Sequence, residues 1–464
     1  MLLSDDPELL ESLCIKHDRA LPRYTSYPTA IELKRSDSEE TAKKAIQTSS
    51  NEPLSLYIHL PYCASLCYFC ACNKIIDADP EKRDQYLDLL DKEAALIKSA
   101  ADSPVSISQV HLGGGSPSLL DPDQFERLFD ILNRHFDLST CTERSIEVDP
   151  RTFSKEKVDT IAKASFNRAS LGVQDFDPKV QELINRVQPY EQTEEITTWL
   201  RESGIQNINL DLIYGLPGQT LDAFSETIKQ VLKLRPERIA LYGYAHVKWK
   251  VKVQQVLTKY GIPDALERIH LFEAALKLFE QAGYEYIGLD HFALPEDELC
   301  IAQRNGKLRR NFMGYTTVCG SGVLGMGVSA ISDISSCLYQ NQPNLKDYQS
   351  SLESGMLPIV KELSRTIEDE IRAFCIERLM CDDKLEVKTV LREFPNHAEL
   401  VEKILSNAFE GIAEYETDNL VNCSDSGVEV TRLGRLFLRH LAAPFDAYLS
   451  SRMKENKAVF SKSL

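Results

Sequence analysis

No part of this 464-residue sequence approaches the roughly 18 consecutive apolar residues that a membrane-spanning helix needs. The first residues, MLLSDDPELLES, are acidic, whereas a secretory signal peptide begins with basic residues. The last residues, SKSL, differ from the peroxisomal SKL signal. These absences predict a cytoplasmic protein with no membrane partner.

Basic residues are also in short supply. The chain has 53 Lys and Arg against 70 Asp and Glu, and a net charge of −17. This balance argues against nonspecific binding to nucleic acids or acidic membranes, although it leaves room for a local basic cavity. The hydrophobic share of 43% and charged share of 27% are typical of globular proteins.

Cysteine is what the sequence has in abundance, with twelve residues in all. A disulfide framework fits poorly, because the chain is long and shows no secretion signal. Four of the cysteines lie within ten positions, as Cys63, Cys67, Cys70 and Cys72 of HLPYCASLCYFCACNK. The other eight are scattered and are interpreted as packing residues: Cys14, Cys141, Cys300, Cys319, Cys337, Cys375, Cys381 and Cys423.

The spacing of the clustered cysteines favours three metal ligands and one bystander. At about 100° per residue, Cys67 lies about 40° from Cys63 and Cys70 about 20° from it on the other side, whereas Cys72 lies about 180° away. Three thiolates would leave one iron of a [4Fe–4S] cluster open to a substrate or cofactor. A zinc site is the alternative, but it would want a second separated pair of ligands, which the nearby sequence does not supply.

Apolar strands and amphipathic helices alternate after about residue 50. The six strand candidates are 54–60, 108–112, 145–149, 168–173, 208–213 and 238–242, with helical patterns such as 84–100, 123–136 and 222–234 between them. This alternation predicts a parallel sheet with crossover helices, in an open or incomplete (β/α)6 barrel. Polar or glycine-rich motifs follow each strand, at the end where parallel barrels carry their chemistry.

The pattern changes to helices from about residue 365, followed by a short hairpin that runs into a further helix. We expect a mainly helical, winged-helix-like C-terminal domain that covers the site, since the acidic charge disfavours DNA binding. The predicted divisions are an N-terminal extension (1–50), a partial barrel (51–350) and the C-terminal domain (351–464).

The C-x₃-C-x₂-C pattern after the first strand resembles the radical S-adenosylmethionine (SAM) superfamily. The resemblance implies that Cys63, Cys67 and Cys70 bind a [4Fe–4S] cluster whose open iron chelates SAM. The other motifs suit that cofactor, because GGGSP (113–117) lets the backbone approach the methionyl group closely and Arg186 offers a bidentate partner for a carboxylate.

A closer resemblance extends from about residue 20 to the end of the chain. PRYTSYPTA (22–30), LYIHLPYC, CYFCACNKI, SIEVDPR, GVQDF, NINLDLIYGLP, YAHV, GLDHFA, RNFMGYTT and LGMGVSAIS are similar to the oxygen-independent coproporphyrinogen III oxidase family. The resemblance implies oxidative decarboxylation of two propionates of coproporphyrinogen III to vinyl groups, giving protoporphyrinogen IX for haem synthesis. It also implies two bound SAM molecules, an electron donor such as flavodoxin or ferredoxin, and a monomer.

The resemblance assigns residues to these ligands. The first SAM molecule is expected to contact Tyr57, Gly114, Gly115, Ser116, Glu147, Gln174, Arg186 and Asp211. The second is expected to contact Phe69, Ile213, Ala245, Met313 and Ile331. Cys72 is expected to act in turnover, as a proton or hydrogen-atom donor. Cations that face the substrate carboxylates are expected among Arg23, Lys74, Arg186, Arg309 and Arg310.

The sequence departs from the family pattern in several places. Met313 replaces a glutamine that would hydrogen-bond the second SAM, and methionine accepts only weakly. Lys248 replaces the usual proline after YAHV, and VCGSGV replaces an acidic loop. Two alternatives within the superfamily stay open. One is a haem chaperone, although such relatives lack the cysteine that matches Cys72 and the PRYTSYP segment. The other is a radical enzyme that degrades haem anaerobically, which the change at Met313 keeps open.

Overall fold

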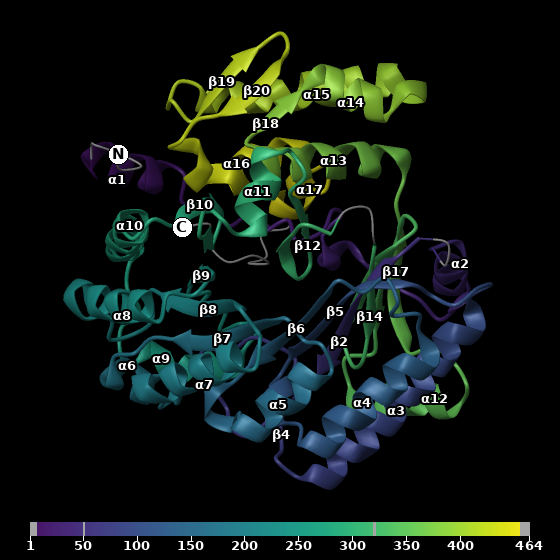
Figure 1. Ribbon diagram of the computed structural model, residues 1–464. Helices are drawn as coiled ribbons and strands as arrows, with labels where there is room; N and C mark the ends of the chain where they lie inside the picture. The colour runs from purple at the N-terminus through teal and green to yellow at the C-terminus, as the bar shows by residue number, and fades with distance from the viewer. Residues whose placement is uncertain (1–6, 50–51, 319–321, 455–464) are drawn as a thin grey trace.

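The computed structural model describes residues 7–49, 52–318 and 322–454 (Figure 1). Six parallel strands form the centre of its large sheet and are neighbours in the order of the chain. They are β2 (Leu54–Leu60), β5 (Ile107–Gly114), β6 (Glu143–Val148), β7 (Arg168–Gln174), β8 (Asn207–Tyr214) and β9 (Arg238–Gly243). Each overlaps a strand expected from the sequence, so the predicted (β/α)6 array is confirmed.

The sheet continues beyond these six strands at both edges. β14 (Val323–Met326) pairs parallel with β2, and β15 (Ile331–Ile334), β16 (Cys337–Asn341), β17 (Ile359–Ser364) and β1 (Lys34–Arg35) follow in antiparallel pairs. At the other edge β11 (His291–Ala293) and β10 (Glu285–Gly288) follow β9. The described strands thus form one 13-stranded sheet with two open edges, of which the sequence patterns had indicated only the centre.

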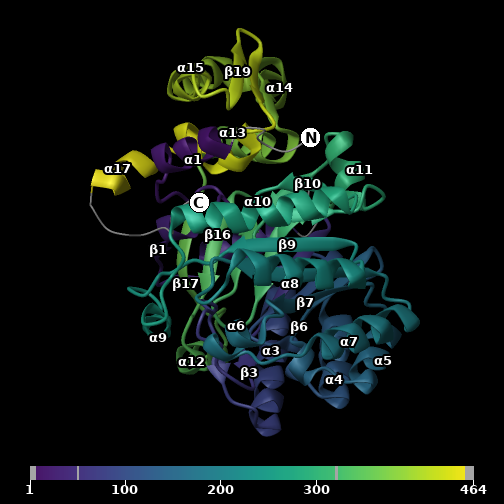
Figure 2. The same cartoon turned by 90° about the vertical axis from the view of Figure 1, so that its left-hand side faces the viewer.

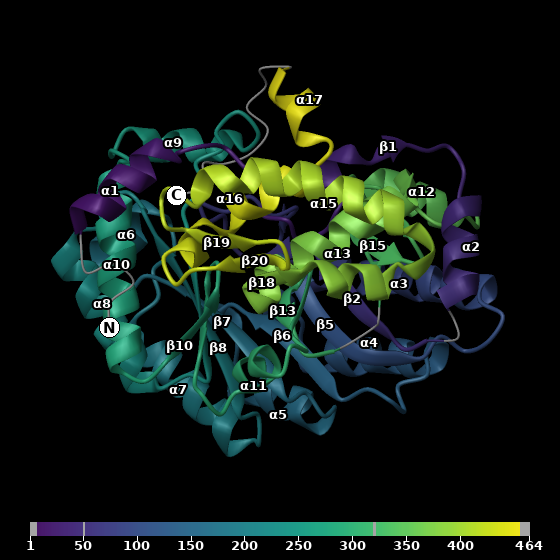
Figure 3. The ribbon, with the colours of Figure 1, turned by 90° about the horizontal axis from the view of Figure 1, so that it is seen from above.

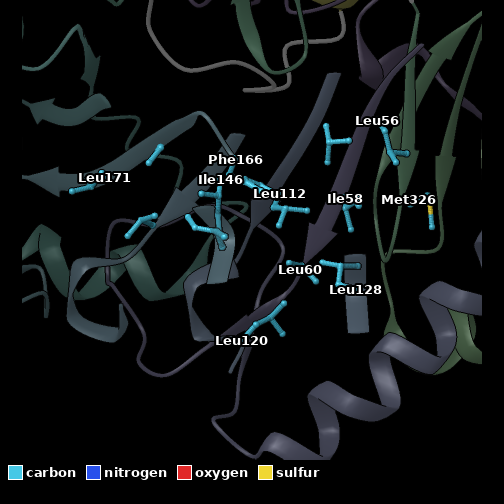
Figure 4. Packing of buried hydrophobic residues seen from close by; sticks show 14 of the residues in the cluster. Leu56, Ile58, Leu60, Leu112, Leu120, Leu128, Ile146, Phe166, Leu171 and Met326 are labelled. Atoms are coloured by element: carbon cyan, nitrogen blue, oxygen red, sulfur yellow. The ribbon is translucent and has the colours of Figure 1, made fainter. Parts of the chain in front are cut away.

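Helices cover the outer face of the six parallel strands (Figures 1 and 2). They are α3 (Pro80–Ala100), α4 (Pro122–His135), α5 (Lys155–Lys163), α6 (Pro178–Leu183), α7 (Tyr190–Glu202), α8 (Leu221–Leu234) and α10 (Ala265–Gln281). Figure 4 shows the core between the two layers, where Ile58, Leu112 and Ile146 from neighbouring strands meet. This packing fixes the strands and therefore the loops at their ends.

The inner face of the same strands is polar. β7 and β8 alternate between buried apolar residues on the outside and partly exposed residues on the inside. Register places Glu147 beside Ser170, Ser170 beside Asn209 and Gly172 beside Asp211. Because side chains on a strand alternate between the two faces, one face can build the core while the other lines a cavity.

The C-terminal elements follow the order of a winged helix: α13 (Ile367–Asp382), β18 (Lys384–Glu386), α14 (Val387–Glu393), α15 (Ala398–Ile412), β19 (Val421–Ser424) and β20 (Gly427–Val430). β18, β20 and β19 form a separate three-stranded sheet. α16 (Leu438–Ala442) and α17 (Leu449–Lys454) complete the chain (Figure 3). The predicted boundary at residue 350 falls inside α12 (Leu345–Glu353), and the large sheet continues to Ser364.

The N-terminal segment packs against the C-terminal elements. α1 (Pro7–Lys16) and the buried rings of Tyr24 and Tyr27 share a hydrophobic cluster with α13, α15 and α16, and α2 (Glu40–Ser49) lies against the large sheet. Among the described residues, no helix is both long and apolar enough to cross a membrane.

Candidate functional site

A cavity lies at the carboxyl ends of the parallel strands, where the motifs were expected to meet. All four clustered cysteines line it, together with Phe69 and Lys74. Seven of the eight residues expected to hold the first SAM molecule also line it: Gly114, Gly115, Ser116, Glu147, Gln174, Arg186 and Asp211. The fold thus gathers into one cavity residues that are separated by up to 148 positions in the chain.

The cysteine loop is built from turns between two short strands, β3 (Tyr62–Cys63) and β4 (Ile75–Ile76), which pair in parallel. The Lys74 ammonium closes the loop by donating to the Cys70 carbonyl at 2.9 Å. Because the loop is not helical, the expectation that Cys72 points away from the other three is wrong. Cys72 lines the same cavity, and its hydrogen bond lowers the pKa of the Cys70 thiol to about 6.

Cys67 lies against two guanidinium groups. Arg151 Nη2 is 3.5 Å and Arg186 Nη1 is 3.7 Å from its sulfur. Asp149 accepts from both arginines, at 2.7 Å and 3.2 Å, and these two cations outweigh the effect of burial and lower the pKa of Asp149. The Cys67 sulfur thus lies in a cationic setting.

Two carboxylates face each other across the cavity. Glu147 accepts from the Gly114 amide at 3.0 Å and from His111 at 3.4 Å, and these bonds outweigh burial and lower its pKa. Asp211 accepts from Ser170 at 2.9 Å and Asn209 at 2.8 Å, but burial and the charge of Glu147 raise its pKa to about 6. Glu147 is therefore the more readily ionised of the two carboxyl groups, and both can accept hydrogen bonds from hydroxyl or ammonium groups.

The three glycines of GGGSP are required by the protein itself. A Cβ on Gly113 would lie 2.8 Å from the Tyr57 ring, and one on Gly115 would lie 2.4 Å from the Pro61 carbonyl oxygen. Gly114 also has a φ of +116°, which favours glycine. The glycines therefore let β5 pack closely against the end of β2 and the start of the cysteine loop, besides leaving backbone groups open to a ligand.

Three residues expected at the second SAM molecule lie together. Phe69 packs against the cluster that contains Ile213, and Gln254 Nε2 donates to the carbonyls of Phe69 and Ala245 at 2.8 Å and 3.1 Å. Gln254 is fully buried and ties the cysteine loop to the loop after β9.

Three further residues expected to contact SAM lie elsewhere: Tyr57 for the first molecule, and Met313 and Ile331 for the second. Tyr57 is buried, with its ring stacked on His111 and its hydroxyl 3.0 Å from His59 Nδ1. Met313, in the hairpin of β12 (Arg309–Asn311) and β13 (Gly314–Thr316), packs near Tyr57 and lines a neighbouring cavity that shares Glu147 and Asp211 with the first. Ile331 begins β15 and is half-buried, outside the lining of these two cavities.

The cations expected to face the substrate have different settings. Lys74 is engaged by loop carbonyls, and Arg309 donates to the Leu308 carbonyl at 3.0 Å. Arg310 lies over the Tyr315 ring, and Arg23 forms an ion pair with Asp290. Of the five, only Lys74 and Arg186 line the cysteine cavity.

The donor set fits an iron–sulfur cluster better than a single ion. No three His, Cys, Asp or Glu side chains in the described parts of the chain are grouped closely enough to hold one metal ion. A zinc site would need such a group, whereas a [4Fe–4S] cluster takes each thiolate on a different iron. The Nε of Arg186 is also buried without a partner among the described residues, as expected beside an anionic ligand.

Sequence reasoning overlooked several residues of this site. Ser170 and Asn209 position Asp211, and Arg151 joins Asp149 to Cys67. A period of two along the strands could have indicated Ser170 and Asn209, because they share the inner face with Glu147 and Asp211. The scattered cysteines are free and buried or half-buried as expected, and Cys319 lies outside the described residues.

Known proteins resemble this chain over nearly its whole length. Residues 57–231 match the model of the radical SAM superfamily. The chain is 40% identical to the oxygen-independent coproporphyrinogen III oxidase of Helicobacter pylori J99, with 96% of each chain covered. It is 38% identical to that of Escherichia coli K12, with 97% of each covered.

The fold agrees equally well. A solved structure of the Escherichia coli coproporphyrinogen III oxidase, described as a radical SAM enzyme, superposes with a TM-score of 0.87 at 38% identity and covers 93% of this chain and 100% of that one. These relatives carry the oxidase name, which disfavours the chaperone and haem-degrading alternatives. The chain therefore belongs to the oxygen-independent coproporphyrinogen III oxidase family of the radical SAM superfamily.

Proposed function

We propose that the protein converts two propionates of coproporphyrinogen III to vinyl groups and so yields protoporphyrinogen IX for haem synthesis. Each propionate loses carbon dioxide, one hydrogen atom from its β-carbon and one electron. The observation that carries the proposal is the cysteine cavity. Its lining includes the three thiols of the C-x₃-C-x₂-C pattern together with carboxylates and glycines from the ends of four strands. Identity with the oxidases over nearly the whole chain supports the choice of substrate.

Cys63, Cys67 and Cys70 are the proposed ligands of a [4Fe–4S] cluster. When bound, the cluster and SAM supply the electron and the carbon radical that remove the substrate hydrogen. Arg151 and Arg186 keep the Cys67 sulfur in a cationic setting, and Asp149 holds both arginines in place.

The first SAM molecule is proposed to lie between the glycines and the two carboxylates. Gly114, Gly115 and Ser116 offer close backbone and hydroxyl contacts, and Glu147 and Asp211 accept from its ammonium or ribose hydroxyls. Gln174, Arg186 and Tyr57 complete the proposed set.

A second SAM molecule is also proposed to bind, beside the first. Phe69, Ile213 and Ala245 lie together and support it, whereas Met313 and Ile331 lie farther along the inner face. Cys72 faces the same cavity as the proposed ligands, which supports a role as proton or hydrogen-atom donor in turnover.

The proposed electron donor is an acidic protein such as flavodoxin or ferredoxin. Residues 244–263, which include α9 (Gln255–Thr258), carry four lysines and no Asp or Glu, although the chain as a whole has a charge of −17. Gln254 of this segment bonds to Phe69 in the cysteine loop, and Trp249 is 52% exposed. A basic, partly apolar surface beside the cluster loop suits an acidic partner.

We also propose that the reaction takes place in the cytoplasm and that the protein acts as a monomer.

Turnover under anaerobic conditions tests the function. The purified chain is reconstituted with iron and sulfide, and then receives SAM, dithionite and coproporphyrinogen III. We expect a divinyl product, about two molecules of carbon dioxide for each tetrapyrrole, and cleavage of SAM.

A parallel reaction with haem in place of coproporphyrinogen is the control. Consumption or stable binding of haem, without any divinyl product from coproporphyrinogen, would refute the proposal. A chemical reductant is chosen so that the result does not depend on the identity of the natural donor.

A further inference from the structure

A further cavity, separate from the two described above, lies beside the carboxyl ends of β8 and β9, and its walls are rich in arginine. α10, the N-terminal segment and the C-terminal elements complete it. Its charged lining consists of three guanidinium groups, from Arg23, Arg268 and Arg439, and one carboxylate, from Asp290. A surplus of cations in an enclosed space is costly unless an anion joins it, and it is unexpected in a chain of charge −17.

Arg268 is the guanidinium that is best prepared for a ligand. Its Nε is buried and has no hydrogen-bond partner among the described residues. The group lies 5.8 Å from the centre of the Tyr214 ring, and it fills the space where Gly215 and Gly243 have no side chains. Packing against a ring and two backbone segments therefore holds the guanidinium in place, without an ion pair to any carboxylate in the described parts of the chain.

The other two arginines belong to segments that close the cavity. Arg23 pairs with Asp290 and lies 5.6 Å from the Tyr242 ring centre, and Arg439 donates to the carbonyls of Leu21 and Pro22. Burial and the nearby charge of Arg23 lower the pKa of Arg439 to about 9. The arginines thus repel one another, and an anion between them would relieve that repulsion.

Size and position limit the ligand. The cavity has a volume of about 80 Å³, several times the roughly 10–15 Å³ that one water needs on the same measure, so it has room for a short acidic arm. Tyr242, under Arg23, also lines the inner cavity that contains Glu147 and Asp211. The Arg23–Tyr242 pair therefore stands between the arginine-lined cavity and the space beside the cysteine cavity.

We propose that this arginine-lined cavity binds one carboxylate arm of the substrate, a propionate other than the one being converted, with Arg268 as its bidentate partner. The inference rests on the proposed function. It adds Arg268 and Arg439, neither of which the sequence motifs indicated, to the residues that recognise the substrate. A planar guanidinium presents paired N–H donors that a carboxylate accepts in bidentate fashion.

Equilibrium binding by the reconstituted holoenzyme tests the proposal. The probe is coproporphyrin III, the fluorescent oxidised form with the same four propionates, and its tetramethyl ester provides a comparison of equal shape without charge. We expect Arg268→Gln to weaken binding of the acid about 10- to 100-fold and to leave binding of the ester unchanged. Arg268→Lys keeps the positive charge but loses the paired N–H donors of the guanidinium, so we expect a smaller loss of affinity for the acid. Arg127→Gln, which removes an ion pair with Asp88 on the outer helices, is the matched control and should change neither.

The outcomes separate this inference from the proposed function. Unchanged affinity of a folded Arg268→Gln variant for the acid overturns the inference, and so does an equal loss for acid and ester, which would indicate packing alone. Should that variant not fold, Arg268→Lys decides, because an affinity equal to that of the wild type contradicts a bidentate contact. A wild-type protein that neither binds nor converts the tetrapyrrole refutes the proposed function, and the inference falls with it.

Discussion

Cys67 differs from the other proposed ligands in its electrostatic setting. Two guanidinium groups flank its sulfur, whereas burial and the neighbouring thiols raise the pKa of Cys63 to about 12. The loop therefore offers one sulfur that is flanked by cations and another, that of Cys63, that must lose its proton as metal binds. Arg151 and Arg186, which lie outside the loop, supply the cations at Cys67, whereas the thiols of the loop itself act on Cys63.

Replacing the cysteines one at a time tests the division of roles. We expect Cys63→Ser, Cys67→Ser and Cys70→Ser each to lose most of the iron and the visible absorbance after anaerobic reconstitution, because a cluster held by two thiolates is labile. Cys72→Ser should retain both but lose turnover.

Cys141→Ser, at a half-buried cysteine outside the loop, is the control for effects of reconstitution. Loss of iron in Cys72→Ser would show that the assignment of three ligands and one donor is wrong.

Residue identity could be read from the sequence more fully than residue orientation. The cysteine spacing and the motifs after the strands predicted most of the cavity lining. The direction of Cys72 could not be predicted, because it depends on turns closed by Lys74 and by the β3–β4 pair. The contact between Arg151 and Cys67 joins residues 84 positions apart and has no local signal.

α3 joins two strands that support the site. Tyr86 donates to the His59 carbonyl at the end of β2 and accepts from the Val328 amide just after β14. Glu93, about two turns further along the same buried face, accepts from the Gly327 amide, Asn341 and Tyr348. One helix thus holds the parallel pair of β14 and β2 in register.

Glu93 gives this joint a pH dependence. Burial raises its pKa from 4.5 to about 7, although three hydrogen bonds oppose the rise. The folded protein therefore keeps a proton that the unfolded chain releases, and the free energy of unfolding falls as pH rises from 4.5 to 7, by up to about 3 kcal/mol. Glu93→Gln should lack this contribution, so its stability relative to wild type should improve across that window.

Urea unfolding of the apo-protein at several pH values measures the difference. Glu126→Gln, on an exposed position of α4, is the control and should follow the wild-type profile. Parallel profiles for the wild type and Glu93→Gln would contradict the assignment.

Elements with a strong pattern were predictable, and those that depend on distant pairing were not. β2 is buried along its whole length, and five of its seven residues are apolar. β14 to β17 are short, and β14 contains a glycine whose Cβ would lie 2.5 Å from the Ile331 carbonyl oxygen. Nothing local shows that β14 pairs with β2, about 270 residues earlier, because that register arises only in the folded sheet.

The whole molecule is closed by contacts between its two ends. His440 Nε2 lies 2.6 Å from the His17 carbonyl, Tyr24 donates to Asp446, and Arg365 Nε donates to the Tyr27 carbonyl at 2.8 Å. The N-terminal segment is thereby held where Arg23 lines the arginine-lined cavity. The expected division into three domains consequently describes the order along the chain better than the packing, since the first and last segments share one core.

Loosening the N-terminal segment should increase its exposure. Arg365→Gln removes the bond to Tyr27 and the ion pair with Asp333, which we expect to raise the rate of tryptic cleavage at Lys16, Arg19 or Arg23 about tenfold. Mass spectrometry of timed digests measures the rate. Arg134→Gln, which breaks only an exposed pair with Asp91, should leave it unchanged, and equal rates for both variants would count against the closing role.

The contact of Arg439 with Leu21 and Pro22 has a consequence for how the protein is made. A ribosome adds about 5 to 20 residues per second, so about 20 to 80 seconds separate the synthesis of Pro22 from that of Arg439. During that interval α1 can pack on α10, but its apolar residues lack their partners in α16. A chain that stalls before its last segment cannot complete the arginine-lined wall, so the nascent protein acquires this part of its architecture only when translation is nearly finished.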